Sequence, residues 1–85
     1  MRKLTHHQLT ILGYLSVNDN YISVVDSVNG SSATINVDGN IKTVRCDTVS
    51  KLFNEGLVSG LKMAQTESEE VWKYDITQKG KRIIQ

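Results

Sequence analysis

Proline is absent from this 85-residue sequence, cysteine occurs once, and only five residues are aromatic. Without proline, glycine and asparagine must mark the turns. The single cysteine, Cys46, excludes an internal disulfide and a zinc site built on several cysteines, and it fits a reducing compartment. No apolar run approaches ~20 residues and the first residues lead into a polar helix, so we expect neither a membrane span nor a secretory peptide. We therefore expect a cytoplasmic protein.

The sequence also lacks an excess of charge of either sign, because it has ten Lys and Arg residues and nine Asp and Glu residues. A dedicated nucleic-acid-binding protein usually carries a strongly basic footprint, so any binding to phosphate must come from local patches. The length and the 39% hydrophobic content suit one small domain with a modest core, and we assign residues 1–85 to a single domain.

The segment "LTHHQLTILGYL" predicts a first helix from Thr5 to about Leu15. Thr5 is placed to cap the helix, and Gln8, three residues later, can reach back to the Thr5 backbone as in a capping box. The residues expected to face inward recur at spacings of three and four; they are Leu4, Gln8, Ile11, Leu12 and Leu15.

The following segment, "YISVVDSVNGSSATINVDGNIKTVR", is rich in Val, Ile and Thr and predicts a three-stranded meander. A two-residue turn at Asn29-Gly30 would place Val24 opposite Ile35. A three-residue loop at 38–40 would place Val37 opposite Ile41, whereas a two-residue turn at Asp38-Gly39 would pair apolar with polar residues, so burial favours the longer loop. The apolar face then consists of Ile22, Val24, Ile35, Val37 and Ile41.

The segment "TVSKLFNEGLVSG" predicts a second helix with Asp47 as N-cap and a left-handed Gly56 closing its C-terminus. Val49, Leu52 and Phe53 form its inward stripe. Two strands, "GLVSGLKM" and "VWKYDI", follow around the polar loop "AQTESEE", and the side chains of Trp72, Tyr74 and Ile76 are expected on one side. Thr77 is suited to cap a last helix over 78–84, which Gly80 weakens by ~1 kcal/mol relative to alanine.

This order of elements resembles the winged-helix family of bacterial and phage DNA-binding regulators. There, a reading helix that ends in an "L..L...GL"-like stop is followed by a two-stranded wing that ends in a Y-x-[IL]-T-x-K-G pattern. The matching residues are Leu52, Gly56, Leu57, Tyr74, Ile76, Thr77, Lys79 and Gly80. The likeness covers Thr48 to about Ile84, and "LTILGYL" is similar to the family's first helix.

The sequence departs from the family between these parts, because a support helix normally lies before the reading helix. Here the interval has the period of strands and the turns of hairpins. We therefore expect an α+β, winged-helix-like fold with three helices, an inserted three-stranded antiparallel meander and a C-terminal β-hairpin wing.

The resemblance implies a small DNA-binding transcriptional regulator whose helix over 47–55 enters the major groove of double-stranded DNA. Lysine can donate to guanine or phosphate, and asparagine can pair with adenine. The candidate nucleic-acid-binding residues are Arg45, Thr48, Ser50, Lys51 and Asn54 around this helix, with Lys62 and Lys73 on the wing. One reading helix recognises only a half-site, so this interpretation favours a homodimer.

An alternative is a protein-binding winged-helix adaptor or inhibitor of phage or plasmid type. The wing tip "TESEE" carries Glu67, Glu69 and Glu70, where a DNA-contacting wing usually has Arg or Lys. Such a tip suits a host protein with a basic surface.

No sequence motif indicates a catalytic or metal site. His6 and His7 are adjacent on a helix and point about 100° apart, so they do not readily share one ion, and no Asp, Glu or Cys lies at i+4 spacing. Cys46 has no paired His or Asp near it in sequence and is expected to be structural. Trp72 and Tyr74 are expected in the core of the wing rather than in a base-stacking platform. We expect no enzyme activity, no cofactor and no metal.

Overall fold

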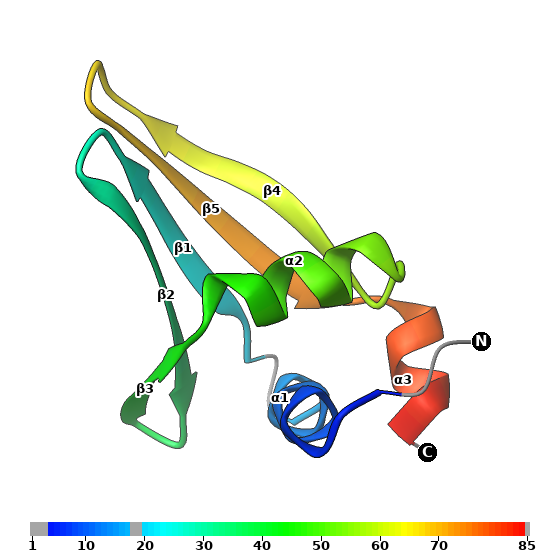
Figure 1. Ribbon diagram of the computed structural model, residues 1–85. Coiled ribbons are helices and arrows are strands. Elements are labelled where there is room, and N and C mark those ends of the chain that lie inside the picture. Colours follow the sequence, from blue (N-terminus) through cyan, green and yellow to red (C-terminus); the bar gives the residue numbers. More distant parts are fainter. Residues whose placement is uncertain (1–3, 18–19, 85) are drawn as a thin grey trace.

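The protein is an α+β domain whose helices gather at one end of a single antiparallel sheet (Figure 1). The computed structural model describes residues 4–17 and 20–84. Within this part of the chain, three helices and five strands follow one another as α1 (His6–Leu15), β1 (Ile22–Ser27), β2 (Gly30–Val37), β3 (Asn40–Val44), α2 (Cys46–Asn54), β4 (Val58–Gln65), β5 (Glu69–Ile76) and α3 (Gln78–Ile84). No helix in the described ranges is long and apolar enough to cross a lipid bilayer.

The first helix begins as its sequence predicts. The Thr5 side chain accepts a hydrogen bond from the Gln8 backbone N–H at 3.2 Å, and the Thr5 backbone N–H donates to Gln8 Oε1 at 3.0 Å. This reciprocal pair is a capping box and satisfies amide groups that the helix itself leaves unpaired. Gln8, Ile11, Leu12 and Leu15 are buried, as the helical spacing indicated.

The predicted three-stranded meander is not a separate unit, and this part of the prediction is corrected. The strand order is β3-β2-β1-β5-β4, so β1 pairs with β5 and joins the meander to the C-terminal hairpin. Ile22 lies opposite Tyr74 and Val24 lies opposite Trp72. The result is one five-stranded sheet whose two long hairpins lie side by side (Figure 1).

In the first hairpin, the pairing register differs from the predicted one by two residues. Ser27 pairs with Gly30, and Ile22, not Val24, lies opposite Ile35. The turn therefore has Val28 and Asn29 at its centre, with serine before them and glycine after them, a sequence typical of a type I turn. A shift of two residues leaves every side chain on its predicted face, so Ile22 and Ile35 are both buried.

The second hairpin contradicts the predicted three-residue loop. Asp38 and Gly39 both have positive φ, 52° and 86°, as a two-residue type I′ turn requires. Val37 consequently pairs with Asn40, and Ile41 pairs with Asn36. Ile41 is 74% exposed and not part of the core, so the conformational preference of Asp-Gly outweighs the burial of one isoleucine.

Helix α2 begins earlier than predicted and ends where predicted. Its N-cap is Arg45, not Asp47, and no side chain caps it. At its end, Gly56 has φ of 75°, its N–H donates to the Phe53 carbonyl, and the Leu57 N–H donates to the Leu52 carbonyl at 2.9 Å. These bonds form a Schellman motif. Phe53, predicted to face inward, is 52% exposed.

The core lies between the sheet and the helices, at the helix-bearing end of the molecule. Its buried apolar residues come from α1, α2, the first four strands and the segment after α2, and partly buried residues of β5 and α3 pack against them. The buried residues are Ile11, Leu12, Leu15, Ile22, Ala33, Ile35, Val44, Val49, Leu52, Leu57 and Val58. The tips of the β1–β2 and β4–β5 hairpins project beyond this core (Figure 1). The sheet therefore has a packed end and a projecting end.

Candidate functional site

Helix α2 packs against the sheet on one side and is exposed to solvent on the other. Val49 and Leu52 are buried in the core, and the helix packs on β2 and β4. On the other side, Ser50, Lys51 and Asn54 are exposed. The helix therefore presents a short polar surface, which we call the α2 surface, defined by Ser50, Lys51 and Asn54.

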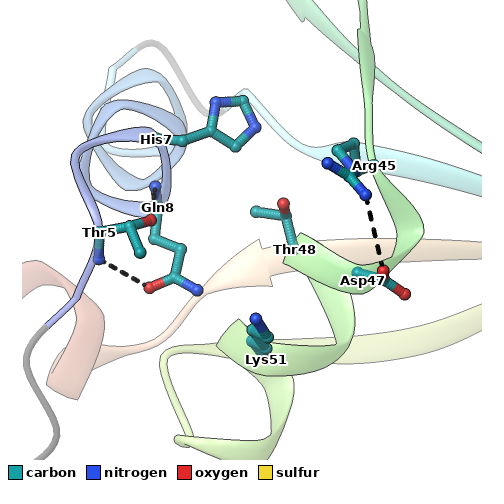
Figure 2. Close-up of a pocket in the computed structure, with 7 residues that line it drawn as sticks. All are labelled: Thr5, His7, Gln8, Arg45, Asp47, Thr48 and Lys51. Carbon is teal, nitrogen blue, oxygen red and sulfur yellow. Dashed lines mark hydrogen bonds and ion pairs between the residues drawn. The ribbon is translucent and has the colours of Figure 1, made fainter.

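A hollow of about 440 Å³ lies between the start of α1 and the first turns of α2 (Figure 2). From α1 and its cap it is lined by Thr5, His7 and Gln8, and from α2 and its cap by Arg45, Asp47, Thr48 and Lys51. Each lining residue carries a polar or charged group, although much of the exposed lining is the apolar part of these side chains, and two basic residues stand against one carboxylate. We call this space the α1–α2 hollow.

Thr48 lies in the wall of this hollow and not on the α2 surface. Its residue is only 7% exposed, and Figure 2 shows its side chain directed into the space between α1 and α2. A DNA group could therefore make the predicted contact with Thr48 only by entering the hollow. Arg45 and Asp47 lie at the rim, 3.9 Å apart and with side chains about four-fifths exposed, at 79% and 82%. Such an exposed pair contributes little stability.

The two lysines predicted on the wing lie on opposite faces of the sheet. Lys62 pairs across the strands with Trp72, its Nζ is 5.5 Å from the Trp72 ring centre, and it is 3.4 Å from Glu70 Oε1. Lys73 is on the reverse face, where its Nζ lies 4.7 Å from the ring centre of Tyr21. Only Lys62 is on the side of the sheet that carries α2, so the two lysines do not form one patch.

An aromatic row links α2 to the projecting sheet, and its first member is Phe53, which was predicted to lie in the inward stripe of the helix. Phe53 meets Tyr74 edge-on with ring centres 6.0 Å apart, and Tyr74 stacks on Trp72 at 6.4 Å. Trp72 and Tyr74 share a face, as their alternation along β5 predicted. Phe53 faces the sheet, as predicted, but it lies beyond the edge of the core and is therefore half exposed.

The two hairpin tips together form an acidic surface. The Val28 N–H donates to the Ser68 carbonyl at 3.3 Å, which fixes the tips beside one another. A shallow hollow there is bordered by Asp26 of the first hairpin and by Glu67, Glu69 and Glu70 of the second. We call these four carboxylates the acidic tip. Asp26 could not be assigned to it from sequence, because its place depends on the pairing of β1 with β5.

No family model, curated protein or solved structure matches this chain.

The residues considered for catalysis or metal binding remain apart. His7 borders the α1–α2 hollow, His6 is exposed, and Cys46 is half-buried at the first residue of α2. Across 4–17 and 20–84, no group of three His, Cys, Asp or Glu residues is arranged to hold a metal ion. Most of the predicted site residues therefore lie in three polar features of the described chain: the α2 surface, the α1–α2 hollow and the acidic tip.

Proposed function

We propose that this protein is a small DNA-binding regulator that places α2 in the major groove of duplex DNA. The observation that carries the proposal is that one side of α2 is packed into the core while the other side is exposed to solvent. Val49 and Leu52 anchor α2 to the sheet, while Ser50, Lys51 and Asn54 remain exposed. The β4–β5 hairpin follows directly, in the order of the winged-helix regulators that the sequence resembles.

The dimensions and chemistry of α2 support this proposal. An α-helix with its side chains is about 10–12 Å across and fits the ~12 Å width of the major groove, and the nine residues of α2 give it about 13 Å of length. Lys51 supplies a donor to guanine or phosphate, and Asn54 supplies the paired donor and acceptor that adenine matches. Asp47 and Glu55 oppose phosphate, so the affinity is expected to be modest for a single chain and to rise in a dimer on paired half-sites.

The docking geometry would differ from that of a winged-helix protein with a support helix. The chain between α1 and α2 forms β1, β2 and β3, and the space between the two helices is the α1–α2 hollow. On that side, among the described residues, the start of α1 faces α2 across this space, and Arg45 and Lys51 border the opening. We expect α2 to approach DNA with the hollow facing one phosphate strand.

A gel-shift titration against genomic fragments at several salt concentrations tests the proposal. Lys51→Ala should weaken binding to all fragments and lower the salt slope by about one, as for the loss of one phosphate contact. Asn54→Ala should reduce the preference for the best fragment by about 1–3 kcal/mol. Lys73→Ala is the matched control, because Lys73 lies on the reverse face, over Tyr21.

The proposal fails if no fragment is shifted at low salt, or if Lys73→Ala weakens binding as much as Lys51→Ala. In either case the exposed side of α2 is not the DNA-binding surface.

A second candidate function is binding of a protein with a basic surface through the acidic tip. The observation that favours it is the side-by-side arrangement of the hairpin tips, which adds Asp26 to the three wing glutamates. Exposed Val28, 82% accessible, adds an apolar contact at the same place. Four carboxylates steer a basic partner toward the tip and repel DNA.

Charge reversal separates the two functions. Glu67→Lys with Glu69→Lys should abolish a complex formed through the acidic tip and leave DNA binding by α2 in place. Glu70 is left unchanged, because it accepts from the Trp72 ring N–H and pairs with Lys62. If the reversed protein still captures its partner, the acidic tip is not the binding surface.

A further inference from the structure

We infer that the α1–α2 hollow is an oxyanion site that receives a phosphate group. The inference deepens the proposed function where the phosphate belongs to DNA, and to that extent rests on it. It stands alone where the phosphate belongs to a free small molecule. The argument begins with two nearly buried side chains that have hydrogen-bonding capacity left over.

The Thr48 hydroxyl is the first of these groups. Thr48 is 7% exposed and lines the hollow, and its hydroxyl forms no hydrogen bond with another described residue. In the same part of the chain, no side-chain oxygen or nitrogen is both fully enclosed and unpaired. The hydroxyl therefore opens onto the hollow, where Figure 2 shows it directed between His7 and Arg45.

The Gln8 amide is the second group. Its Oε1 accepts the Thr5 N–H at 3.0 Å, which fixes the orientation of the amide. Nε2 is left with two donor hydrogens and no partner among the described residues, and Figure 2 shows it pointing toward α2. Gln8 is 8% exposed, so these donors are held in place by packing and do not swing freely in solvent.

The charges around these donors select an anion. Arg45 and Lys51 border the hollow with two positive charges, and α2, nine residues long, directs its uncapped N-terminus toward the same side. Asp47 is the only carboxylate in the lining and is drawn to Arg45 at 3.9 Å. A phosphate group offers several acceptor oxygens to a hydroxyl, an amide, a guanidinium and an ammonium group at once.

The hollow has room for more than a lone phosphate, so a phosphate group that belongs to a larger molecule also fits. About 440 Å³ exceeds the space that a lone phosphate occupies, and the hollow is open to solvent. A sugar-phosphate backbone and a phosphorylated small molecule share the required chemistry. The test therefore uses both kinds of probe.

Calorimetric titration of the full chain in a phosphate-free buffer tests the inference. The probes are inorganic phosphate, a nucleoside 5′-monophosphate with the unphosphorylated nucleoside as control, and duplex DNA. Thr48→Val keeps the side-chain shape and removes the donor, so affinity for a phosphate-bearing probe should fall about tenfold. Thr48→Ser keeps the hydroxyl and should preserve binding.

Gln8→Glu is the second variant, because glutamate can maintain the capping box while replacing the free donors with negative charge. It should abolish phosphate binding while the helical signal in circular dichroism is retained. Asp47→Asn should tighten binding. Thr10→Val is the matched control, since the Thr10 hydroxyl donates to the His6 carbonyl at 2.9 Å and does not line the hollow.

The outcomes distinguish this inference from the proposed function. If duplex affinity falls in Thr48→Val and Gln8→Glu, the hollow receives a backbone phosphate. If the nucleotide binds and responds to these variants while DNA does not, the site takes a free phosphate-bearing ligand and the DNA proposal fails separately. If no probe responds to either variant, the inference is overturned, even where Lys51→Ala and Asn54→Ala show that DNA binds.

Discussion

Gly80 and Gly13 lie inside helices, but only Gly80 is required by packing. A Cβ atom on Gly80 would collide with the Leu57 carbonyl oxygen and approach Ile76 Cγ1 to 2.8 Å, whereas a Cβ on Gly13 would meet nothing within 4 Å. The sequence indicated only that Gly80 weakens the last helix. The structure shows that it allows α3 to approach the corner between α2 and β4.

Gly80→Ala should therefore destabilise the protein by about 2 kcal/mol, because overpacking against a backbone carbonyl outweighs the gain in helix propensity. Gly13→Ala should stabilise it by up to about 1 kcal/mol. Urea denaturation of both variants measures the difference. Equal stabilisation by the two substitutions would show that α3 does not pack closely against Leu57.

Thr77 joins the start of α3 to the end of α2 through one hydroxyl. It donates to the Gly56 carbonyl at 2.7 Å and accepts the Gly80 N–H at 3.1 Å, so it caps α3 and ties it to the end of α2. Lys79 adds a bond from Nζ to the Glu55 carbonyl at 2.9 Å. The cap was predictable from sequence, but the link to α2 was not.

Thr77→Val should cost about 1–3 kcal/mol of unfolding free energy, since it preserves shape and removes both hydrogen bonds. Thr77→Ser, which keeps the hydroxyl, should recover most of this loss in the same denaturation measurement. A Val variant as stable as the original chain would contradict the role of the hydroxyl.

At the scale of elements, the sequence predicted what is local. The capping box of α1, the Schellman end of α2 and the cap of α3 each depend on residues within a few positions of one another, and all three are confirmed. The pairing of β1 with β5 joins residues almost fifty positions apart and leaves no periodic signal. The wing glutamates were predicted as an acidic tip, but the place of Asp26 beside them and the burial of Thr48 follow from such distant contacts and could not be predicted.

The two hairpins show how turn chemistry and burial compete. Burial favoured a longer second loop with Ile41 inside, but the Asp38-Gly39 turn places Ile41 on the open face, at 74% exposure. Ile35, on the core face of the neighbouring strand, is 1% exposed. The preference of Asp-Gly for a two-residue turn thus determines this register, and it outweighs the burial of one isoleucine.

This register predicts that substitution of Ile41 has a small effect on the unfolding free energy and that substitution of Ile35 has a large one. Ile41→Thr should change the unfolding free energy by no more than about 0.5 kcal/mol, as for a typical surface substitution. Ile35→Ala should cost about 2–5 kcal/mol through lost burial and a residual cavity. Thermal or urea unfolding compares them directly, and a large loss in Ile41→Thr would support the three-residue loop instead.

The whole molecule is elongated, with principal extents of 40 × 29 × 19 Å, and its two ends differ in chemistry. One end combines the core, α2 and the α1–α2 hollow, with Arg45 and Lys51 at the hollow's rim. The other is the acidic tip, where Asp26 and the wing glutamates meet. A near-neutral total charge therefore conceals two ends with different charged residues, which composition alone could not reveal.

This separation is the basis of the proposed function, in which the helix end meets DNA and the acidic tip points away from it. The sequence located the α2 surface, because Lys51 and Asn54 follow from helical periodicity. It did not locate the hollow, because the hollow lies between α1 and α2, which are separated along the chain by β1, β2 and β3.

The most direct test is amide chemical-shift mapping of the isotopically labelled protein during titration with duplex DNA at low salt. We predict that the largest shifts occur over 45–54 and at the start of α1, and that residues 26–30 and 66–70 of the hairpin tips remain unchanged. Shifts confined to the hairpin tips, or no shifts at all, would contradict the proposal that α2 is the DNA-binding surface.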